Sequence, residues 1–280
     1  MNNTYKANEE IYISVDVEAD GKIPSINSMM ALGATVAGWR TRDGQIIDAD
    51  PSLPENRFYA QLKPISQEWT ADAIAVAVLD GWNNATDDPT GALKHQWLVE
   101  NGEDPSVAME RFTAWVVERK EALDAKVPVF VGFPVVYDWM WVYWYMIAFT
   151  KDGSPFGHGR AADIKTAFAI KSGNSIVSSI KRRMPKFLHS KLPHTHKAVD
   201  DAAEQGQLAL NIFRWSGSEN PISDNVKQSA QEIRDFLESE LSNANEHAEI
   251  YSARARELAL ELREKALKNL AKWQEDRNKK

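Results

Sequence analysis

The sequence predicts an α/β domain, in which a mixed central sheet is flanked by helices, followed by a C-terminal long-helix extension. Three observations support this prediction. The segment IYISVDV at 11–17 alternates apolar and polar residues, the segment at 106–133 has a helical pattern followed by a short apolar run, and the segment from 223 onward is rich in charge without glycine or proline. The 280 residues suffice for one large core and an appendage.

The first third of the chain predicts a three-stranded meander. The segment at 11–17 places Ile or Val at every second position, as a half-buried strand does. Two further strands are expected at 29–39 and 57–63, because the connection at 41–56 is rich in the Gly, Pro and Asp residues that favour turns. The segment at 80–104 has no clean period and is expected to be an irregular connection.

Helices and a buried strand follow. The segment at 106–123 has apolar residues at helical spacing and opens after Asp104-Pro105, which is a typical helix start. It leads into VPVFVGF at 127–133, a short apolar run typical of a buried strand. Two more helices are expected at 163–170 and 198–215. A helix that precedes a buried strand indicates an α/β domain.

Composition excludes several classes of protein. The formal charge of −7 argues against a protein that coats nucleic acid non-specifically. Without cysteine, the chain can form neither disulfides nor thiolate metal sites, and it has no cysteine nucleophile. The N-terminal segment lacks the basic and apolar parts of a signal peptide, so we expect a cytoplasmic protein.

A change of character near position 216 predicts two parts, a domain at 1–216 and a linker with a charged helical tail at 217–280. Residues 223–280 contain 11 Lys and Arg and 12 Asp and Glu, which is typical of a solvated helix. One interpretation is a helical hairpin that folds back on the domain, and the other is a coiled coil that forms a homodimer. A narrow seam at alternating steps of four and three underlies the second interpretation: Leu237, Leu241, Ala244, Ala248, Tyr251, Ala255, Leu258 and Leu262.

The longest apolar run, VFVGFPVVYDWMWVYWYMIAF at 129–149, carries one formal charge, Asp138. Its length would suffice to cross a bilayer, but Gly132, Pro134 and Asp138 interrupt its first half, so we expect no membrane span. The run instead predicts a strand and a helix that meet at Asp138. Taken alone, this aspartate is best interpreted as the cap of the following helix.

Other acidic residues could share a site with Asp138. Asp16 and Glu18 are two apart at the end of a strand, so their side chains face the same side, where their repulsion calls for a cation. His196 and Asp201 are five apart at the start of a helix, from which both could reach one site. Each pattern alone is weak, because exposed strands tolerate paired acids and helix starts favour aspartate.

Together, these motifs resemble the DEDDh family of 3′-to-5′ exonucleases, which includes proofreading exonucleases and oligoribonuclease. VDVEADG, FVGFPVVYD and HTHKAVDDAAEQ stand in the family's order and approximate spacing, and the resemblance covers roughly residues 9–215. It implies a ribonuclease H-like fold and hydrolysis that depends on two Mg²⁺ or Mn²⁺ ions. It also implies that Asp16, Glu18, Asp138 and Asp201 are the metal ligands and that His196 is the general base.

Three positions bear on this resemblance: Pro134, Asp163 and His194. Many members have Asn where this chain has Pro134, four residues before Asp138, and this Asn is not expected to bind metal. The departure therefore bears on contacts with the terminal nucleotide. Asp163 is interpreted as a helix cap. His194 is an alternative general base, although the H-x-A-x-x-D spacing favours His196.

The residue types suit this chemistry. Two divalent ions can activate water, relieve charge in the transition state and stabilise the departing oxygen. Carboxylate oxygens prefer hard Mg²⁺ or Mn²⁺, and a first shell of oxygens without cysteine argues against zinc. An imidazole near its natural pKa can accept the proton of water at neutral pH.

A basic segment indicates where the substrate backbone could bind. Residues 164–199 contain no Asp or Glu, and this segment precedes the candidate general base directly. Such contacts would depend on salt and not on base sequence. The alternative is a solvated face. The nucleic-acid-binding candidates are Lys181, Arg182, Arg183 and Lys186. One or two aromatic residues among Phe133, Tyr137, Trp139 and Trp141 could stack on bases, although most are expected in the core.

Two hypotheses for function follow. The first is a metal-dependent 3′-5′ exonuclease that binds the 3′ ends of single-stranded DNA or RNA and releases nucleoside 5′-monophosphates. The second is a catalytically weak nucleic-acid-binding or scaffold protein that retains the fold and assembles through its tail. The complete set of four acids and a histidine favours the first hypothesis, and Pro134 is the one point for the second. No motif distinguishes DNA from RNA, because that choice rests on contacts with the 2′-OH.

Overall fold

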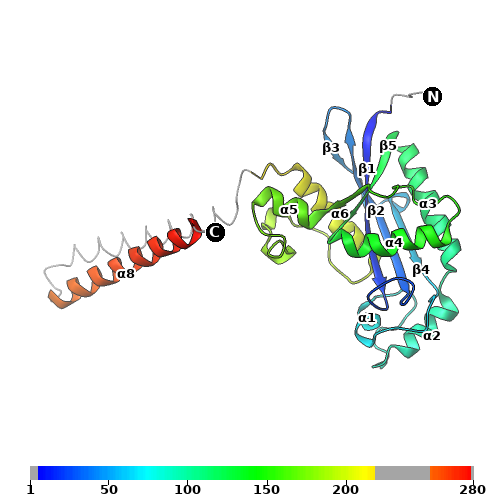
Figure 1. Ribbon diagram of the computed structural model, residues 1–280, viewed down its shortest axis with the longest axis horizontal. Helices are drawn as coiled ribbons and strands as arrows, with labels where there is room; N and C mark the ends of the chain where they lie inside the picture. Colours follow the sequence, from blue (N-terminus) through cyan, green and yellow to red (C-terminus); the bar gives the residue numbers. More distant parts are fainter. Residues whose placement is uncertain (1–5, 218–252, 279–280) are drawn as a thin grey trace. The chain divides into compact units, whose positions relative to one another are not determined.

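The computed structural model describes residues 6–217 and 253–278 of the chain, which divides into two units, Met1–Ser218 and Glu219–Lys280 (Figure 1). The first unit is built on a mixed sheet whose strands are joined in the order β3-β2-β1-β5-β6, with β4 also paired to β2. The first four strands pair antiparallel, whereas β5 and β6 run parallel to β1. The strands are β1 (Asn8–Ala19), β2 (Met29–Thr41), β3 (Ile46–Asp48), β4 (Arg57–Gln61), β5 (Ala125–Gly132) and β6 (Ala161–Asp163).

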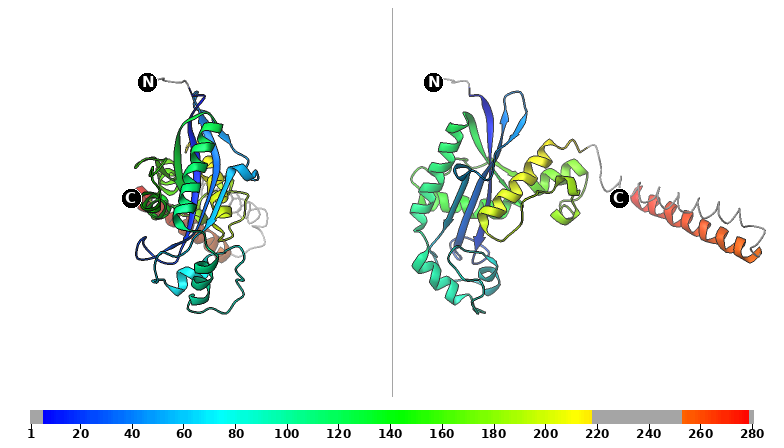
Figure 2. Two further views of the ribbon diagram at one scale, coloured as in Figure 1. Left: turned by 90° about the vertical axis from the view of Figure 1, so that its right-hand side faces the viewer. Right: turned by 180° about the vertical axis from the view of Figure 1, so that it is seen from behind.

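Helices cover both faces of this sheet (Figures 1 and 2). One face of β1, with Ile11 and Ile13, packs against α3 and α4, and the opposite face, with Tyr12, packs against α5 and α6. A third cluster lies under α1 and α2. The helices of this unit are α1 (Ala71–Val76), α2 (Ala92–Asn101), α3 (Pro105–Ala122), α4 (Val135–Phe149), α5 (Ile164–Ser172) and α6 (Ala198–Arg214), with short 3-10 turns η1 (Pro54–Asn56), η2 (Lys181–Arg183) and η3 (Lys186–Leu188).

This architecture confirms the predicted α/β class. A meander of antiparallel strands that leads into parallel strands, with helices on both faces, matches the ribonuclease H-like fold that the resemblance implies. The three predicted strands of the meander appear as β1, β2 and β4, and the predicted helices appear as α3, α5 and α6. Among the described residues, no helix is long and apolar enough to cross a membrane.

The prediction of an irregular connection at 80–104 is wrong, because this segment contains α2. The face that α2 buries includes Lys94 and His95, each only 3% exposed, beside Leu98. Lys94 Nζ donates hydrogen bonds to the carbonyl oxygens of Ile74 and Ala77 at the end of α1. Two polar residues at buried positions interrupt the apolar period from which a helix is predicted.

Asp138 does not cap the following helix, as it would if it were interpreted alone. Helix α4 begins at Val135, so Asp138 lies in its first turn and Pro134 is the N-cap, which lacks a side-chain acceptor. The backbone N–H of Val135 instead donates to Asp163 Oδ2 at 2.7 Å. The other oxygen of Asp163 accepts from the N–H of Thr166 and caps α5, as predicted. One aspartate therefore serves the starts of two helices.

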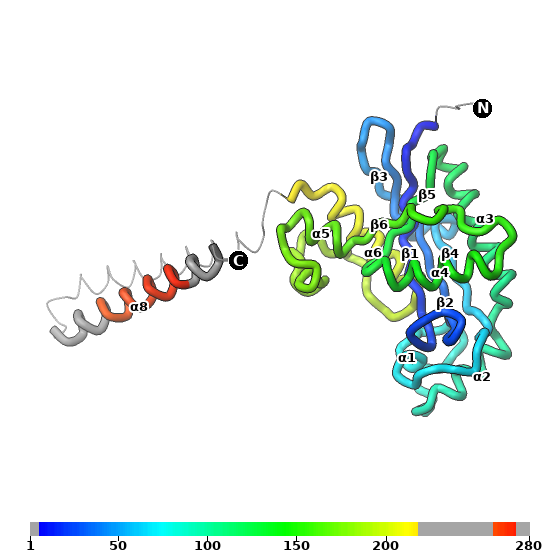
Figure 3. The backbone as a smooth tube through the Cα atoms, in the orientation of Figure 1, coloured from blue at the N-terminus to red at the C-terminus, as the bar shows by residue number. Residues whose placement is uncertain are grey.

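The second unit contains α8 (Ala253–Asn278), and Figure 3 traces its backbone. Most of the predicted heptad seam, at 237–251, lies outside the described residues. Within α8, Leu260, Leu262 and Leu267 are exposed.

Candidate active site

Strand β1 carries two carboxylates near its end. Asp16 lies opposite Gly33 and Glu18 opposite Ala31 on β2, and both acidic residues are half-buried. On the other edge of β1, the pairing with β5 ends at Ser14. Because alternate residues of a strand face the same side, Asp16 and Glu18 reach the space beyond the end of β5 together.

Helix α4 brings a third carboxylate to this space. Asp138 is 5% exposed, and its Oδ1 accepts a hydrogen bond of 3.2 Å from the N–H of Val17, between the two acids of β1. Gly132 at the end of β5 makes room for it, since a Cβ atom there would lie 3.2 Å from Asp138 Oδ2 and 3.0 Å from Val135 Cα. The interrupted apolar run thus places its one charge beside β1.

Helix α6 brings the fourth carboxylate. A Cβ atom on Gly33 would lie 2.1 Å from the backbone of Ala198, so only glycine lets the start of α6 approach β2 this closely. Asp201 is consequently buried next to the β1 acids, and carboxylate oxygens of Asp16, Glu18 and Asp201 all lie within 4.8 Å of one another. The structure therefore brings together all four of the acidic residues singled out in the sequence.

The cluster is electrostatically unfavourable without cations. Burial raises the pKa of the Asp16 carboxyl well above its usual range, and the Asp138 and Glu18 carboxylates raise it further. Burial also raises the pKa of Glu18 to about 8, with Asp201 as the next cause. For Asp138, burial raises the pKa to about 7 against the opposing hydrogen bond from Val17. Oxygen donors that repel one another in a partly closed space fit divalent metal ions.

Metal binding is expected to stabilise the protein more at pH 8 than at pH 6. The pKa of Glu18 rises from 4.5 to about 8 on folding, so the folded protein holds more protons than the unfolded chain between these values. The stability of the metal-free protein therefore falls as pH rises through this window. Ligands must be ionised to bind metal, and bound metal offsets their repulsion.

Thermal melts with Mn²⁺, Mg²⁺ or EDTA at both pH values measure this effect. We expect the increase in Tm on adding Mn²⁺ to be larger by about 5 °C at pH 8, because each kcal/mol is equivalent to about 2–4 °C for a domain of this size. An equal increase at the two pH values would show that these carboxylates do not hold the metal.

Two histidines border the cluster. Nδ1 of His194 lies 3.1 Å from Asp201 Oδ1, and the two imidazole rings, of His194 and His196, lie 4.7 Å apart by their centroids. The backbone N–H groups of Thr195 and His196 also donate to the Asp201 carboxylate, at 2.7 and 3.0 Å. Both rings are exposed and could meet substrate, so the structure brings both candidate bases to the site.

Comparison with known proteins decides the family. No family model matches the chain. The 3′-5′ DNA exonuclease Cap18 of Escherichia coli is 31% identical over 214 residues, which cover 75% of this chain and 96% of that protein. This chain belongs to the 3′-5′ exonuclease family. The relationship confirms the family predicted from the three motifs.

Solved structures of Escherichia coli Exonuclease I are also similar. One, in complex with a 5cy-dA13 oligonucleotide, is 12% identical and has a TM-score of 0.43 over 74% of this chain and 40% of that chain. The zinc-bound form of the Exonuclease I complex with single-stranded DNA is 12% identical, with a TM-score of 0.44 over 82% of this chain and 43% of that one. This exonuclease chain thus spans about two fifths of the length of Exonuclease I.

The predicted nucleic-acid-binding residues of the exonuclease fall on η2 and η3. Lys181 forms an ion pair with Glu204, one turn after Asp201 on α6, and its Nζ lies 5.6 Å from the centre of the Phe133 ring. The positive charge of Lys181 partly opposes the rise in pKa that burial causes at Asp16 and Asp138. Arg182, Arg183 and Lys186 are exposed.

The candidate stacking residues divide into two groups. Trp141 is fully buried, and Trp139 packs against Phe130 at 5.2 Å between ring centroids, so both tryptophans belong to the exonuclease core. Phe133 lies beside Lys181, and Tyr137 is 37% exposed with its hydroxyl donating to the carbonyl oxygen of Gly21. Only these last two remain available to a base.

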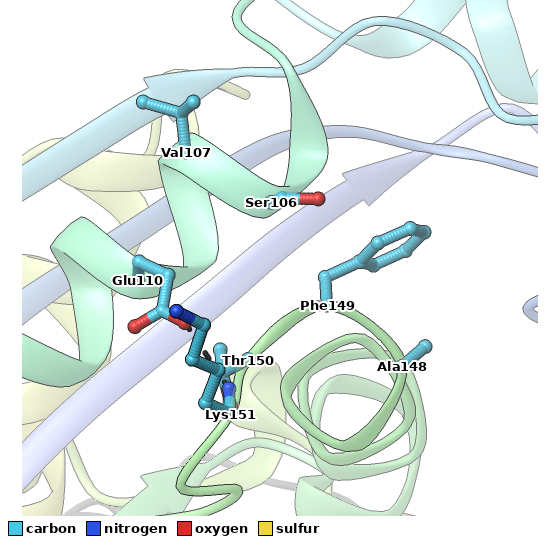
Figure 4. A pocket seen from close by; sticks show the side chains of 7 residues that line it. All are labelled: Ser106, Val107, Glu110, Ala148, Phe149, Thr150 and Lys151. Carbon is cyan, nitrogen blue, oxygen red and sulfur yellow. Dashed lines mark hydrogen bonds between the residues drawn. The ribbon is translucent and has the colours of Figure 1, made fainter.

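One pocket of the exonuclease domain lies elsewhere, where α3 begins and α4 ends (Figure 4). Glu110 crosses it to accept a hydrogen bond from the backbone N–H of Lys151 at 3.1 Å. Its lining residues include none of the predicted site residues: Ser106, Val107, Glu110, Ala148, Phe149, Thr150 and Lys151. The carboxylates approach the opposite end of α4, so this pocket is separate from the candidate active site.

The sequence motifs assign no role to one further acid near the end of β1. Asp20 directly follows β1, is fully buried, and accepts a hydrogen bond of 2.6 Å from the N–H of Ser28. Burial raises the pKa of Asp20 to about 6. Its backbone oxygen accepts from the N–H of Thr70, so it links the end of β1 to the segment before α1. The spacing D-x-E-x-D continues the period of the strand, but burial beyond the strand end carries no sequence signal.

Proposed function

We propose that this protein is a metal-dependent 3′-5′ exonuclease of the DEDDh group that removes nucleoside 5′-monophosphates from the 3′ end of single-stranded DNA. The observation that carries the proposal is the meeting of carboxylate oxygens from Asp16, Glu18 and Asp201 within 4.8 Å, beside two histidines. The relationship with a 3′-5′ DNA exonuclease supports DNA as the substrate.

Asp16, Glu18, Asp138 and Asp201 would hold two Mg²⁺ or Mn²⁺ ions, because these hard ions prefer oxygen ligands. When bound, such ions would supply Lewis acidity for the attacking water, the transferred phosphate and the departing oxygen. The protein fixes the ligands through rigid elements: β1 holds two of them, and α4 and α6 each hold one. The hydrogen bonds from Val17 and His196 orient two of the carboxylates.

His196 would accept the proton of the attacking water, since an imidazole titrates near neutral pH. The departing 3′ oxygen would take up a proton from solvent. Lys181 would face the negatively charged substrate at the edge of the carboxylate cluster, and Arg182, Arg183 and Lys186 are exposed for its phosphates. These cations give affinity that does not depend on base sequence.

An assay on 5′-labelled single-stranded DNA and RNA of one sequence tests the function. With Mg²⁺ or Mn²⁺ we expect DNA to shorten from the 3′ end as a ladder, RNA to shorten more slowly, and EDTA to stop both. A 3′-phosphorylated DNA of the same sequence is the matched control for direction. If neither polymer shortens with either ion, the exonuclease proposal fails; if RNA shortens faster, the choice of DNA fails.

We further propose that the tail forms a homodimer. Leu262, a member of the predicted seam, is 60% exposed on α8, and a helical partner on that face would cover it. Truncation after Ser218 should then lower the mass measured by light scattering from that of a full-length dimer to that of a truncated monomer, while the circular dichroism of the first unit persists. A full-length protein that is already monomeric would contradict the proposal.

A further inference from the structure

The segment at 164–188, which we call the arm, combines α5, η2 and η3 and contains six cations and no acid. Two of the cations serve the fold. Lys171 Nζ donates hydrogen bonds of 2.7–2.8 Å to three carbonyl groups at the end of α6, and Lys181 pairs with Glu204 on the same helix. The arm is thereby attached to the helix that carries Asp201.

Three other cations of the arm have no such role. Arg182, Arg183 and Lys186 are exposed, and their side chains form no ion pair or hydrogen bond within the described part of the chain. A cation without a partner on a surface that lacks acids attracts anions. Because Lys181 directly precedes Arg182 and pairs with Glu204, one turn after Asp201 on α6, this positive surface begins beside the candidate active site.

The arm also exposes apolar side chains. Val177 and Ile170 are 85% and 76% exposed, which are the highest values among the large apolar residues of the described chain. Phe187 and Ile176 are 58% and 54% exposed, and the Phe187 ring packs edge-on against Trp215 at 6.4 Å. The arm therefore exposes both apolar side chains and cations, a combination that suits a partner with apolar surface and negative charge.

We infer that the arm binds single-stranded DNA on the 5′ side of the nucleotide being removed. Phosphates would lie against Arg182, Arg183 and Lys186, and the apolar faces of unpaired bases would contact Val177, Ile170 and Phe187. This inference rests on the proposed function and adds the surface that holds the rest of the strand. A strand held in this way stays bound after each cleavage, so the arm would favour long substrates over short ones.

Two arm variants separate the two kinds of contact. R182A/R183A removes charge, and I170S/V177S removes apolar surface at positions too exposed to support the fold. K126A/K151A is the charge-matched control, because both lysines are exposed and lie outside the arm. V107S/I147S is the apolar control, with exposed fractions of 57% and 54% on α3 and α4.

The first measurement is the affinity of the full-length protein for a fluorescent single-stranded oligothymidine by anisotropy in Ca²⁺ or in EDTA. We expect Kd to rise about tenfold in R182A/R183A and the slope of log Kd against log salt to fall by about 1.4, which is two contacts at about 0.7 each. In I170S/V177S we expect Kd to rise about fivefold with the slope unchanged. Both controls should stay within about twofold of the wild type.

The second measurement is hydrolysis of the 5′-p-nitrophenyl ester of thymidine monophosphate, which needs the catalytic centre but is too small to reach the arm. I170S/V177S and both controls should hydrolyse it like the wild type. Wild-type DNA affinity in both arm variants would overturn the inference, and so would a parallel loss of ester hydrolysis in I170S/V177S. If even the wild type hydrolyses neither ester nor DNA, the proposed function fails, and the affinities still decide the role of the arm.

Discussion

Replacement of Asp16 by asparagine should reduce 3′-5′ hydrolysis by roughly a thousandfold and, at the same time, stabilise the metal-free protein. Asp16 lies among three other carboxylates, all of which raise its pKa. A neutral amide removes this repulsion but cannot replace a carboxylate as a ligand for a hard divalent ion. Loss of about 4 kcal/mol of transition-state stabilisation corresponds to roughly a thousandfold in rate.

The opposite signs of these two effects make the test sharp. A mutation that merely damaged the fold would lower both activity and Tm. For D16N we instead expect the Tm in EDTA to rise, most clearly at about pH 8, where the repulsion between the carboxylates is largest. D104N is the matched control. Asp104 caps α3 through the N–H of Ser106, and asparagine caps equally well, so D104N should change neither quantity. Activity of D16N near that of wild type would remove Asp16 from the catalytic site.

Asp16 also illustrates what the sequence could predict. The period of β1 places it on one side with Glu18, and the period of α6 locates Asp201 in the first turn of that helix. Both signals are local, because a strand repeats every two residues and a helix every 3.6. The meeting of these two elements followed only from the family resemblance, since contacts over about 185 residues leave no mark on local periodicity.

The features that sequence reasoning missed depend on distant partners. Asp163 caps α4 from 28 residues away, which permits a helix start at Val135 that no nearby side chain supports. The many aromatic residues after Asp138 have a similar explanation. Trp141 and Tyr145 are fully buried, and the Tyr145 hydroxyl accepts a hydrogen bond from the N–H of Met29 at the start of β2. These residues anchor α4 in the core and so fix Asp138.

The second large effect is expected at His196, where glutamine should reduce the rate by about 10²–10⁴-fold, the usual contribution of a general base. The same substitution of His194 should cost no more than about tenfold. Rates from about pH 5 to pH 9 measure the difference. At each pH in this range H196Q should be slower than H194Q, because only H196Q lacks the group that accepts the proton of the attacking water.

The structure favours His196 because its backbone is fixed and its ring is free. Its backbone N–H donates to Asp201, and its carbonyl oxygen accepts from the N–H of Val78 at 2.8 Å. These contacts hold its backbone in the left-handed conformation, with φ of +60°, which residues other than glycine rarely adopt. No described residue forms a hydrogen bond with its ring nitrogens, whereas Nδ1 of His194 faces Asp201. The Asp201 carboxylate holds the His194 ring in place, which leaves the His196 ring as the one that can turn toward an attacking water. If H194Q proves the more damaging variant, the two roles must be exchanged.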